Sequence, residues 1–191
     1  MVHIENMVRS SYPGLYNKIP SIAVRPAIGF LKRLFHEKEI NAFLDKNSRL
    51  AGLDFVESIL EHLNISYKVN HRQLENIPAI GKVIIVANHP LGAADALTLL
   101  KMISDARQDK TIKIVANQML SHIPQLAPLL IPVDNIQGRL TRLSLQAIDK
   151  ALENEEVVIF FPAGEVSRAS LNGIKDTYWK SGFLKIAQRT S

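Results

Sequence analysis

The chain has 191 residues, enough for one globular domain with a substantial core, and its apolar fraction of 47% and charged fraction of 21% argue against disorder over most of its length. The sequence contains no cysteine, which excludes disulfides, thiolate metal sites and cysteine nucleophiles. Its longest apolar runs, VIIVA and LAPLLIPV, are far shorter than the roughly 18 residues that span a bilayer, and no signal-peptide pattern opens the chain. We therefore expect a soluble or peripheral protein.

The formal net charge of +5 is concentrated near the N-terminus, where residues 1–50 hold eight basic and four acidic side chains. A basic segment of this kind can face nucleic acid or an anionic membrane, and charge alone does not separate the two. A solvated basic face is the simpler alternative.

The N-terminal part is predicted to change from irregular chain to helices. Residues 1–26 include three prolines and predict irregular structure. From Ala27 to Lys38, apolar residues at helical spacing alternate with basic ones, which predicts an amphipathic helix. A second helix is expected over Asp54 to Leu63, with Asp54 as its cap. Residues 65–69 (ISYKV) predict a short strand.

Strands and helices then alternate. We expect strands at residues 82–87, 111–116, 130–133 and 155–161, and helices at 94–106 and 138–152. β-Branched runs separated by helices predict an α/β fold, with a largely parallel or mixed sheet flanked by helices and preceded by an N-terminal helical segment.

The division into parts follows from this change of pattern. Residues 1–75 are expected to form the irregular and helical basic segment, and residues 76–191 the α/β core. The final stretch YWKSGFLKIAQR, residues 178–189, predicts the helix of a further unit whose strand does not follow. We therefore expect the chain to be a C-terminally shortened form of a longer protein.

The sequence NHPLGAAD, residues 88–95, joins the strand at 82–87 to the following helix. A histidine acts as a general base when a carboxylate holds its other ring nitrogen, and His89 and Asp95 can form such a pair. Pro90 and Gly92 allow the loop to fold back toward the helix. A hydrogen-bonded loop histidine and an acidic first helical turn are the alternative explanation.

A second motif, FFPAGEVSR at residues 160–168, follows another apolar strand. The carboxyl ends of parallel strands share one edge of a sheet, so this loop should lie near His89. Arg168 can hold a phosphate or carboxylate, and Glu165 can accept from a hydroxyl or orient the arginine. A solvated turn with a surface ion pair is the alternative.

NHPLGAAD and FFPAGEVSR in this order resemble the signatures of the glycerolipid acyltransferase family, also called lysophosphatidic acid acyltransferase-like, over roughly residue 76 to the end. The spacing of His89 and Asp95 is one residue longer than the family's commonest pattern, and Ala163 stands where that pattern has an acid. In these features the chain is similar to the bacterial hemolysin-like branch, associated with acylation of lyso-lipids, including ornithine-type lipids.

The resemblance implies that His89 is the general base and Asp95 its orienter. Further substrate-binding positions are carried over to both motifs, namely Asn88, Gly92, Phe161, Pro162, Gly164, Glu165 and Arg168. The expected reaction moves an acyl group from an acyl carrier protein or coenzyme A thioester, as co-substrate, to a hydroxyl of a lysophospholipid or lyso-ornithine-type lipid. It needs a base, an oxyanion stabiliser and anion recognition, but no metal or other cofactor.

The basic segment is accordingly expected to contact a membrane and not nucleic acid, with the protein peripheral at the cytoplasmic face of the inner membrane. The main alternative is a non-catalytic lipid- or partner-binding module with the same fold. A nucleotide-binding domain is disfavoured because the sequence has neither GxxxxGK nor GxGxxG.

Overall fold

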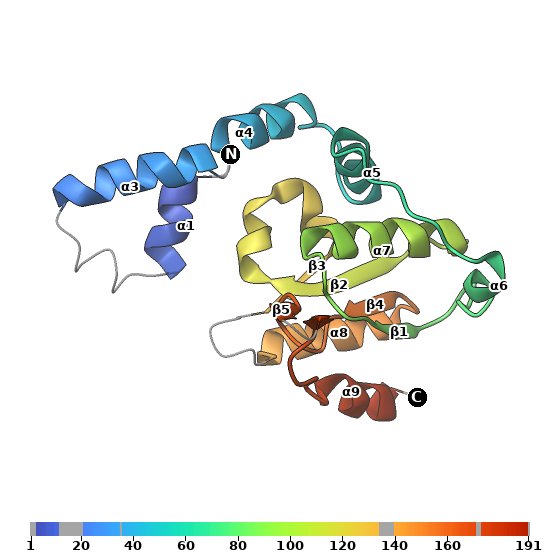
Figure 1. The fold of residues 1–191 in the computed structure, drawn as a ribbon. Helices are drawn as coiled ribbons and strands as arrows, with labels where there is room; N and C mark the ends of the chain where they lie inside the picture. The colour runs from blue at the N-terminus through green and yellow to red at the C-terminus, as the bar shows by residue number, and fades with distance from the viewer. Residues whose placement is uncertain (1–2, 12–20, 35, 134–139, 171–172, 191) are drawn as a thin grey trace. The chain divides into compact units, whose positions relative to one another are not determined.

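The computed structural model describes residues 3–11, 21–34, 36–133, 140–170 and 173–190 (Figure 1). The chain divides into two compact units, residues 1–50 and residues 51–191. The core predicted at residues 76–191 lies within the second unit, together with the helices α5 (Leu53–His62) and α6 (His71–Leu74).

The first unit contains the helices α1 (Ile4–Ser11), α3 (Ser21–Leu34) and α4 (Glu37–Lys46). The prediction of irregular structure over residues 1–26 is therefore wrong for residues 4–11 and 21–26, which are helical. Residues 12–20 lie outside the described residues. The Ile4 amide donates to the Glu37 carboxylate at 3.0 Å, and Val24 and Ile28 are buried beside Pro26. Burial of apolar residues offsets the hydrogen bond that a proline removes from a helix.

The helix predicted from Ala27 to Lys38 is interrupted. α3 ends at Leu34, and His36, with a φ of 51°, precedes α4 in the left-handed conformation. Periodicity alone misses this break because α4 continues the helical pattern.

The second unit is built on a parallel sheet of four strands in the order β1-β4-β2-β3. The strands are β1 (Val83–Val86), β2 (Ile112–Asn117), β3 (Leu130–Val133) and β4 (Val157–Phe160). Each lies within or beside its predicted range. The sheet with its flanking helices confirms the predicted α/β class.

Side chains alternate between the two faces of a sheet along each strand, so the apolar strands have two faces to bury. Helices cover both of them. Val158 and Phe160 of β4 pack with α8 (Arg142–Glu153) and with Ile186 of α9 (Gly182–Thr190). α7 (Ala93–Ala106) lies on the other side of the sheet, where it contacts α5 and β2 (Figure 1). All four β4 residues are buried, which fixes this strand at the centre of the core.

Other elements differ from the prediction. α5 begins after Gly52, so Asp54 lies in its first turn and is not its cap. Residues 65–69 form no strand, although their burial alternates as a strand's would. Two 3₁₀ helices, η1 (Gln118–His122) and η2 (Pro124–Leu129), connect β2 to β3, and β5 (Arg168–Ser170) pairs with β6 (Gly173–Lys175) in an antiparallel hairpin.

The strand register brings the two sequence motifs together. Val86 and Phe160, the last residues of β1 and β4, are partners in neighbouring parallel strands. The Ala87 amide extends this ladder by donating to the Phe160 carbonyl at 3.1 Å. The loops after β1 and β4 therefore leave the same edge of the sheet side by side, as expected for the carboxyl ends of parallel strands.

Candidate active site

His89 lies three residues beyond the end of β1, in the loop that leads into α7. Its side chain is largely buried, with 17% of its surface exposed, and that of Asp95 is similar at 18%. A rigid strand and the first turn of a helix thus hold the predicted pair at the carboxyl edge of the sheet.

The Nδ1 atom of His89 lies 3.4 Å from the Oδ2 atom of Asp95. This distance allows an ion pair but exceeds the roughly 2.7 to 3.2 Å of a good N–H···O hydrogen bond. Within the described residues the buried Nδ1 atom has no hydrogen-bond partner, whereas Asp95 Oδ2 accepts from the Leu91 amide at 2.6 Å. The two side chains thus face each other at ion-pair distance without forming a hydrogen bond.

Gly92 makes the loop compact. It is the residue before α7 and has a φ of 66°, a left-handed conformation that glycine adopts without strain. A Cβ atom there would lie 3.4 Å from Cγ2 of Val166, in the loop after β4. Gly92 therefore permits the turn toward Asp95, and the second motif packs at ordinary van der Waals distance from it.

Phe161 provides one of the contacts between the two loops. Its ring stacks on that of His89, with centroids 4.0 Å apart and an angle of 21° between the planes. Behind it Pro162 is buried, and the Gly164 amide closes a turn onto the Phe161 carbonyl at 2.9 Å. The Gly164 amide is thus already bonded, which removes it from the donors available to an oxyanion.

Glu165 and Arg168 occupy the outer part of this loop. Arg168 Nη2 donates to Glu165 Oε2 at 2.9 Å, and both side chains are exposed, the arginine at 71%. The bond from Arg168, and then one from Thr177, holds the pKa of the Glu165 carboxyl below its ordinary value. Among the described residues, no hydrogen bond or ion pair joins Arg168 or Glu165 to His89 or Asp95, and the pair that they form is the surface ion pair expected under the alternative explanation.

Asn88, the remaining predicted residue, lies exposed beside His89. The structure thus brings together His89, Asp95, Gly92 and Phe161, and it leaves Asn88, Glu165 and Arg168 at the surface of the same edge.

Asp176, which the sequence did not single out, also belongs to this region, together with Ser167 of the second motif and Trp179 of the final stretch. Ser167, Asp176 and Trp179 form a hydrogen-bonded cluster that reaches the backbone of His89. No periodicity links an aspartate to partners 9 and 87 residues away, so sequence patterns carry no signal for it.

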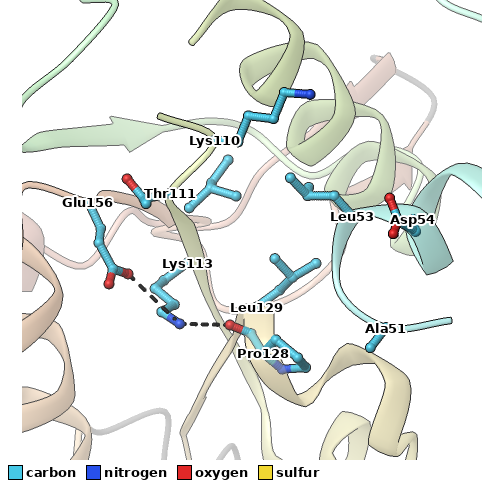
Figure 2. Close-up of a pocket in the computed structure, with 10 residues that line it drawn as sticks. Ala51, Leu53, Asp54, Lys110, Thr111, Lys113, Pro128, Leu129 and Glu156 are labelled. Carbon is cyan, nitrogen blue, oxygen red and sulfur yellow. Dashed lines mark hydrogen bonds and ion pairs between the residues drawn. The ribbon is translucent and has the colours of Figure 1, made fainter. Parts of the chain in front are cut away.

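The cavity in Figure 2, of about 370 Å³, lies elsewhere, at the amino ends of the strands. Its lining includes Thr111 and Glu156, which directly precede β2 and β4, and Lys113 donates to the Pro128 carbonyl at 2.7 Å across it.

Within the described residues no group of three histidine or acidic side chains could hold a metal ion, and no helix is long and apolar enough to cross a membrane.

The sequence matches the model of an acyltransferase family over residues 7–191. A relative from Bacteroides thetaiotaomicron, named lyso-glycine lipid O-acyltransferase, is 31% identical over 96% of this chain and 65% of its own length. A second protein of that name, from Phocaeicola vulgatus, is 33% identical over 96% of this chain and 63% of its own. The chain thus spans slightly less than two thirds of each relative's length, and no solved structure gives a significant match.

Proposed function

Because the chain belongs to the acyltransferase family, we propose that it moves a fatty acyl group from a thioester donor to a hydroxyl of a lyso-lipid. The observation that carries this proposal is the His89 imidazole, stacked on Phe161 with one nitrogen facing Asp95 at the edge where the two motifs meet. The donor is an acyl carrier protein or coenzyme A thioester.

His89 acts as the general base in this proposal. With Nδ1 turned to Asp95, Nε2 takes the proton of the acceptor hydroxyl while its oxygen attacks the thioester carbonyl. The carbon–sulfur bond then breaks, and the leaving thiolate receives that proton from the imidazolium. The products are the ester and the free thiol, and the base returns to its starting state.

The developing oxyanion needs hydrogen-bond donors, and the N-terminus of α7 is our candidate. The first amides of an α-helix have no partner within the helix, and the helix dipole places partial positive charge there. α7 begins at Ala93, directly after the loop that carries His89. We assign Gly92 the role of opening this end of the helix to the substrate.

We propose a lyso-glycine lipid as the acceptor, on the basis of the names of both relatives. A glycine headgroup acylated on nitrogen keeps a free carboxylate. Arg168 suits such a group because a guanidinium forms strong charge-assisted bonds with carboxylates. Lys175 is the partner of Arg168 in the β5–β6 register and is also exposed, which adds a second cation at this position.

Membrane contact is proposed for the first unit. In α3 the side chains of Phe30 and Leu34 are 65% and 56% exposed, and Lys32 and Arg33 lie in the last turn. Exposed apolar residues next to lysine and arginine are the composition of a helix that lies in an anionic membrane surface. Since thioester donors are made in the cytoplasm, we propose the cytoplasmic face of the inner membrane.

The experiment is an assay of the purified chain with a lyso-glycine lipid in vesicles and either an acyl carrier protein or a coenzyme A thioester. Mass spectrometry of the lipid should show a new ester, with the matching free thiol released. A lysophospholipid and a lyso-ornithine lipid serve as competing acceptors. Protein that binds the vesicles but forms no ester with any donor and acceptor would contradict the proposed activity and favour a lipid-binding module.

A further inference from the structure

Asp176, in the segment after β6, joins three separate parts of the site. Its Oδ1 atom accepts from the Ser167 hydroxyl in the loop after β4 and from the His89 amide, at 3.4 Å, in the loop after β1. Its Oδ2 atom accepts from the Trp179 indole Nε1 at 2.7 Å. One carboxylate therefore contacts both sequence motifs and the segment that follows them.

The backbone of His89 is held on both sides by this cluster. Its amide donates to Asp176, and its carbonyl accepts from the Ser167 amide at 2.9 Å. Ser167 is in turn bonded through its hydroxyl to Asp176. The cluster thus fixes the main chain of the residue whose ring stacks on Phe161.

Trp179 and Lys180 connect Asp176 to the rest of the fold. The Trp179 ring meets that of Phe183, at the start of α9, in an edge-to-face contact with centroids 6.5 Å apart. The Lys180 amide donates to the Pro162 carbonyl at 3.1 Å, directly after Phe161. Asp176 is therefore anchored to packed parts of the second unit.

Asp176 is ionised at neutral pH in this setting. The Ser167 hydrogen bond, followed by those from Trp179 and the His89 amide, holds the pKa of its carboxyl below the ordinary value. Hydrogen bonds to a charged acceptor are about twice as strong as neutral ones, which suits the carboxylate to holding a loop.

We propose that Asp176 is a positioning residue for acyl transfer. It holds the His89 backbone through its own carboxylate and through Ser167, so that the imidazole stays stacked on Phe161 with Nδ1 facing Asp95. Asp176 takes no proton from the substrate, because its contacts are with the His89 main chain, whereas the ring nitrogen faces Asp95. The effect of Asp176 on acyl transfer rests on the proposed function. Its role in holding the His89 backbone does not.

The first test compares steady-state kinetics of the full chain carrying Asp176→Ala, Asp176→Asn or Ser167→Ala. The control is Asp149→Ala, which removes the partner of Arg189 in the α8–α9 region. Asp176→Ala should lower kcat about 10- to 100-fold, because small displacements of a base have effects of this size, while KM for donor and acceptor changes less than about twofold. The kcat of Asp176→Asn should lie between those of the wild type and Asp176→Ala. One oxygen of the asparagine still accepts a hydrogen bond, but its NH₂ group faces the indole N–H donor of Trp179.

The second test does not require turnover. Diethyl pyrocarbonate modifies exposed imidazoles, and mass spectrometry gives the modification rate at His89 separately from the other histidines. Release of the loop should raise the modification rate at His89 several-fold in Asp176→Ala, and by a smaller factor in Ser167→Ala. Asp149→Ala should keep the wild-type rate. A general loss of folding would raise the rates at several histidines together and would be visible in the melting curve.

A His89-specific increase together with the fall in kcat supports the inference. Wild-type modification rates at His89 in Asp176→Ala, or in Asp176→Asn if the alanine variant does not fold, would overturn it. If the wild-type protein shows no acyl transfer, the proposed function fails while the modification rates still decide the role of Asp176.

Discussion

The ring of His89 lies on that of Phe161, 4.0 Å away between centroids, and this contact joins the loops that follow two neighbouring strands. Stacked aromatic pairs contribute about 0.5 to 1.5 kcal/mol beyond the area that they bury. The contact limits rotation of the imidazole about its Cβ–Cγ bond, so the ring keeps the orientation in which Nδ1 faces Asp95.

Replacement of Asp95 by asparagine should separate the two roles of this residue. The amide oxygen can still accept from the Leu91 amide, so the loop and the melting temperature should be retained. The neutral side chain no longer stabilises the imidazolium, so we expect kcat to fall about 10²- to 10⁴-fold. Asp149→Asn, at the Arg189 pair, is the matched control. A kcat within twofold of wild type would show that Asp95 does not assist the base.

Removal of Arg168 should affect the acceptor and leave the donor unchanged. Loss of one charge-assisted bond to a carboxylate corresponds to an increase of about tenfold in the acceptor KM. The measurement is the KM of Arg168→Ala for each substrate, with Arg189→Ala as a control for the loss of an exposed arginine. An increase confined to the donor KM would assign Arg168 to the thioester instead.

The membrane contact of α3 is tested by a charge at Leu34. Leu34→Asp removes an exposed leucine from the proposed contact. The affinity for anionic vesicles, measured by co-sedimentation, should fall roughly tenfold. Leu63→Asp, next to α5, is the matched control because Leu63 is also 56% exposed. Equal weakening in both variants, or in neither, would count against a membrane role for α3.

Arg107 should be the most important ion for stability on the opposite edge of the sheet. Its side chain is only 1% exposed, pairs with Asp109, and donates to the Pro78 and Gly81 carbonyls at 2.8 Å. Arg107→Ala removes the donor to the Pro78 and Gly81 carbonyls and leaves Asp109 with the Thr111 amide. It should lower the free energy of unfolding by about 3 to 5 kcal/mol in urea titrations. Arg189→Ala, which breaks an exposed pair, should cost about 1 kcal/mol or less, and equal losses would contradict this assignment.

The sequence predicted those features that depend on local pattern and strand order. Continuous apolar runs located the four strands, and the rule that parallel strands end at one edge placed the loop that contains Phe161 near His89. The helix break at His36 and the chain between Ile65 and Val69 were missed for a different reason. For residues 65–69, the Tyr67 hydroxyl donates to Asp105 of α7 at 2.9 Å. The segment is thus held by a side-chain hydrogen bond and not by the backbone hydrogen bonds of a strand.

The Asp176 cluster was beyond sequence reasoning because it depends on contacts between distant segments. Its aspartate reaches the His89 backbone only once β1 and β4 are paired and the β5–β6 hairpin has turned the chain back. Such contacts are specific in three dimensions but have no period along the chain.

The most direct test of the central claim is the rate of ester formation by His89→Gln, measured with a lyso-glycine lipid and the preferred thioester donor. Glutamine is polar and of similar length but cannot act as a base at neutral pH. His71→Gln, on α6, is the matched histidine control. We predict that kcat falls at least about 10²-fold in His89→Gln and stays at the wild-type value in His71→Gln. Ester formation by folded His89→Gln at the wild-type rate would contradict the account.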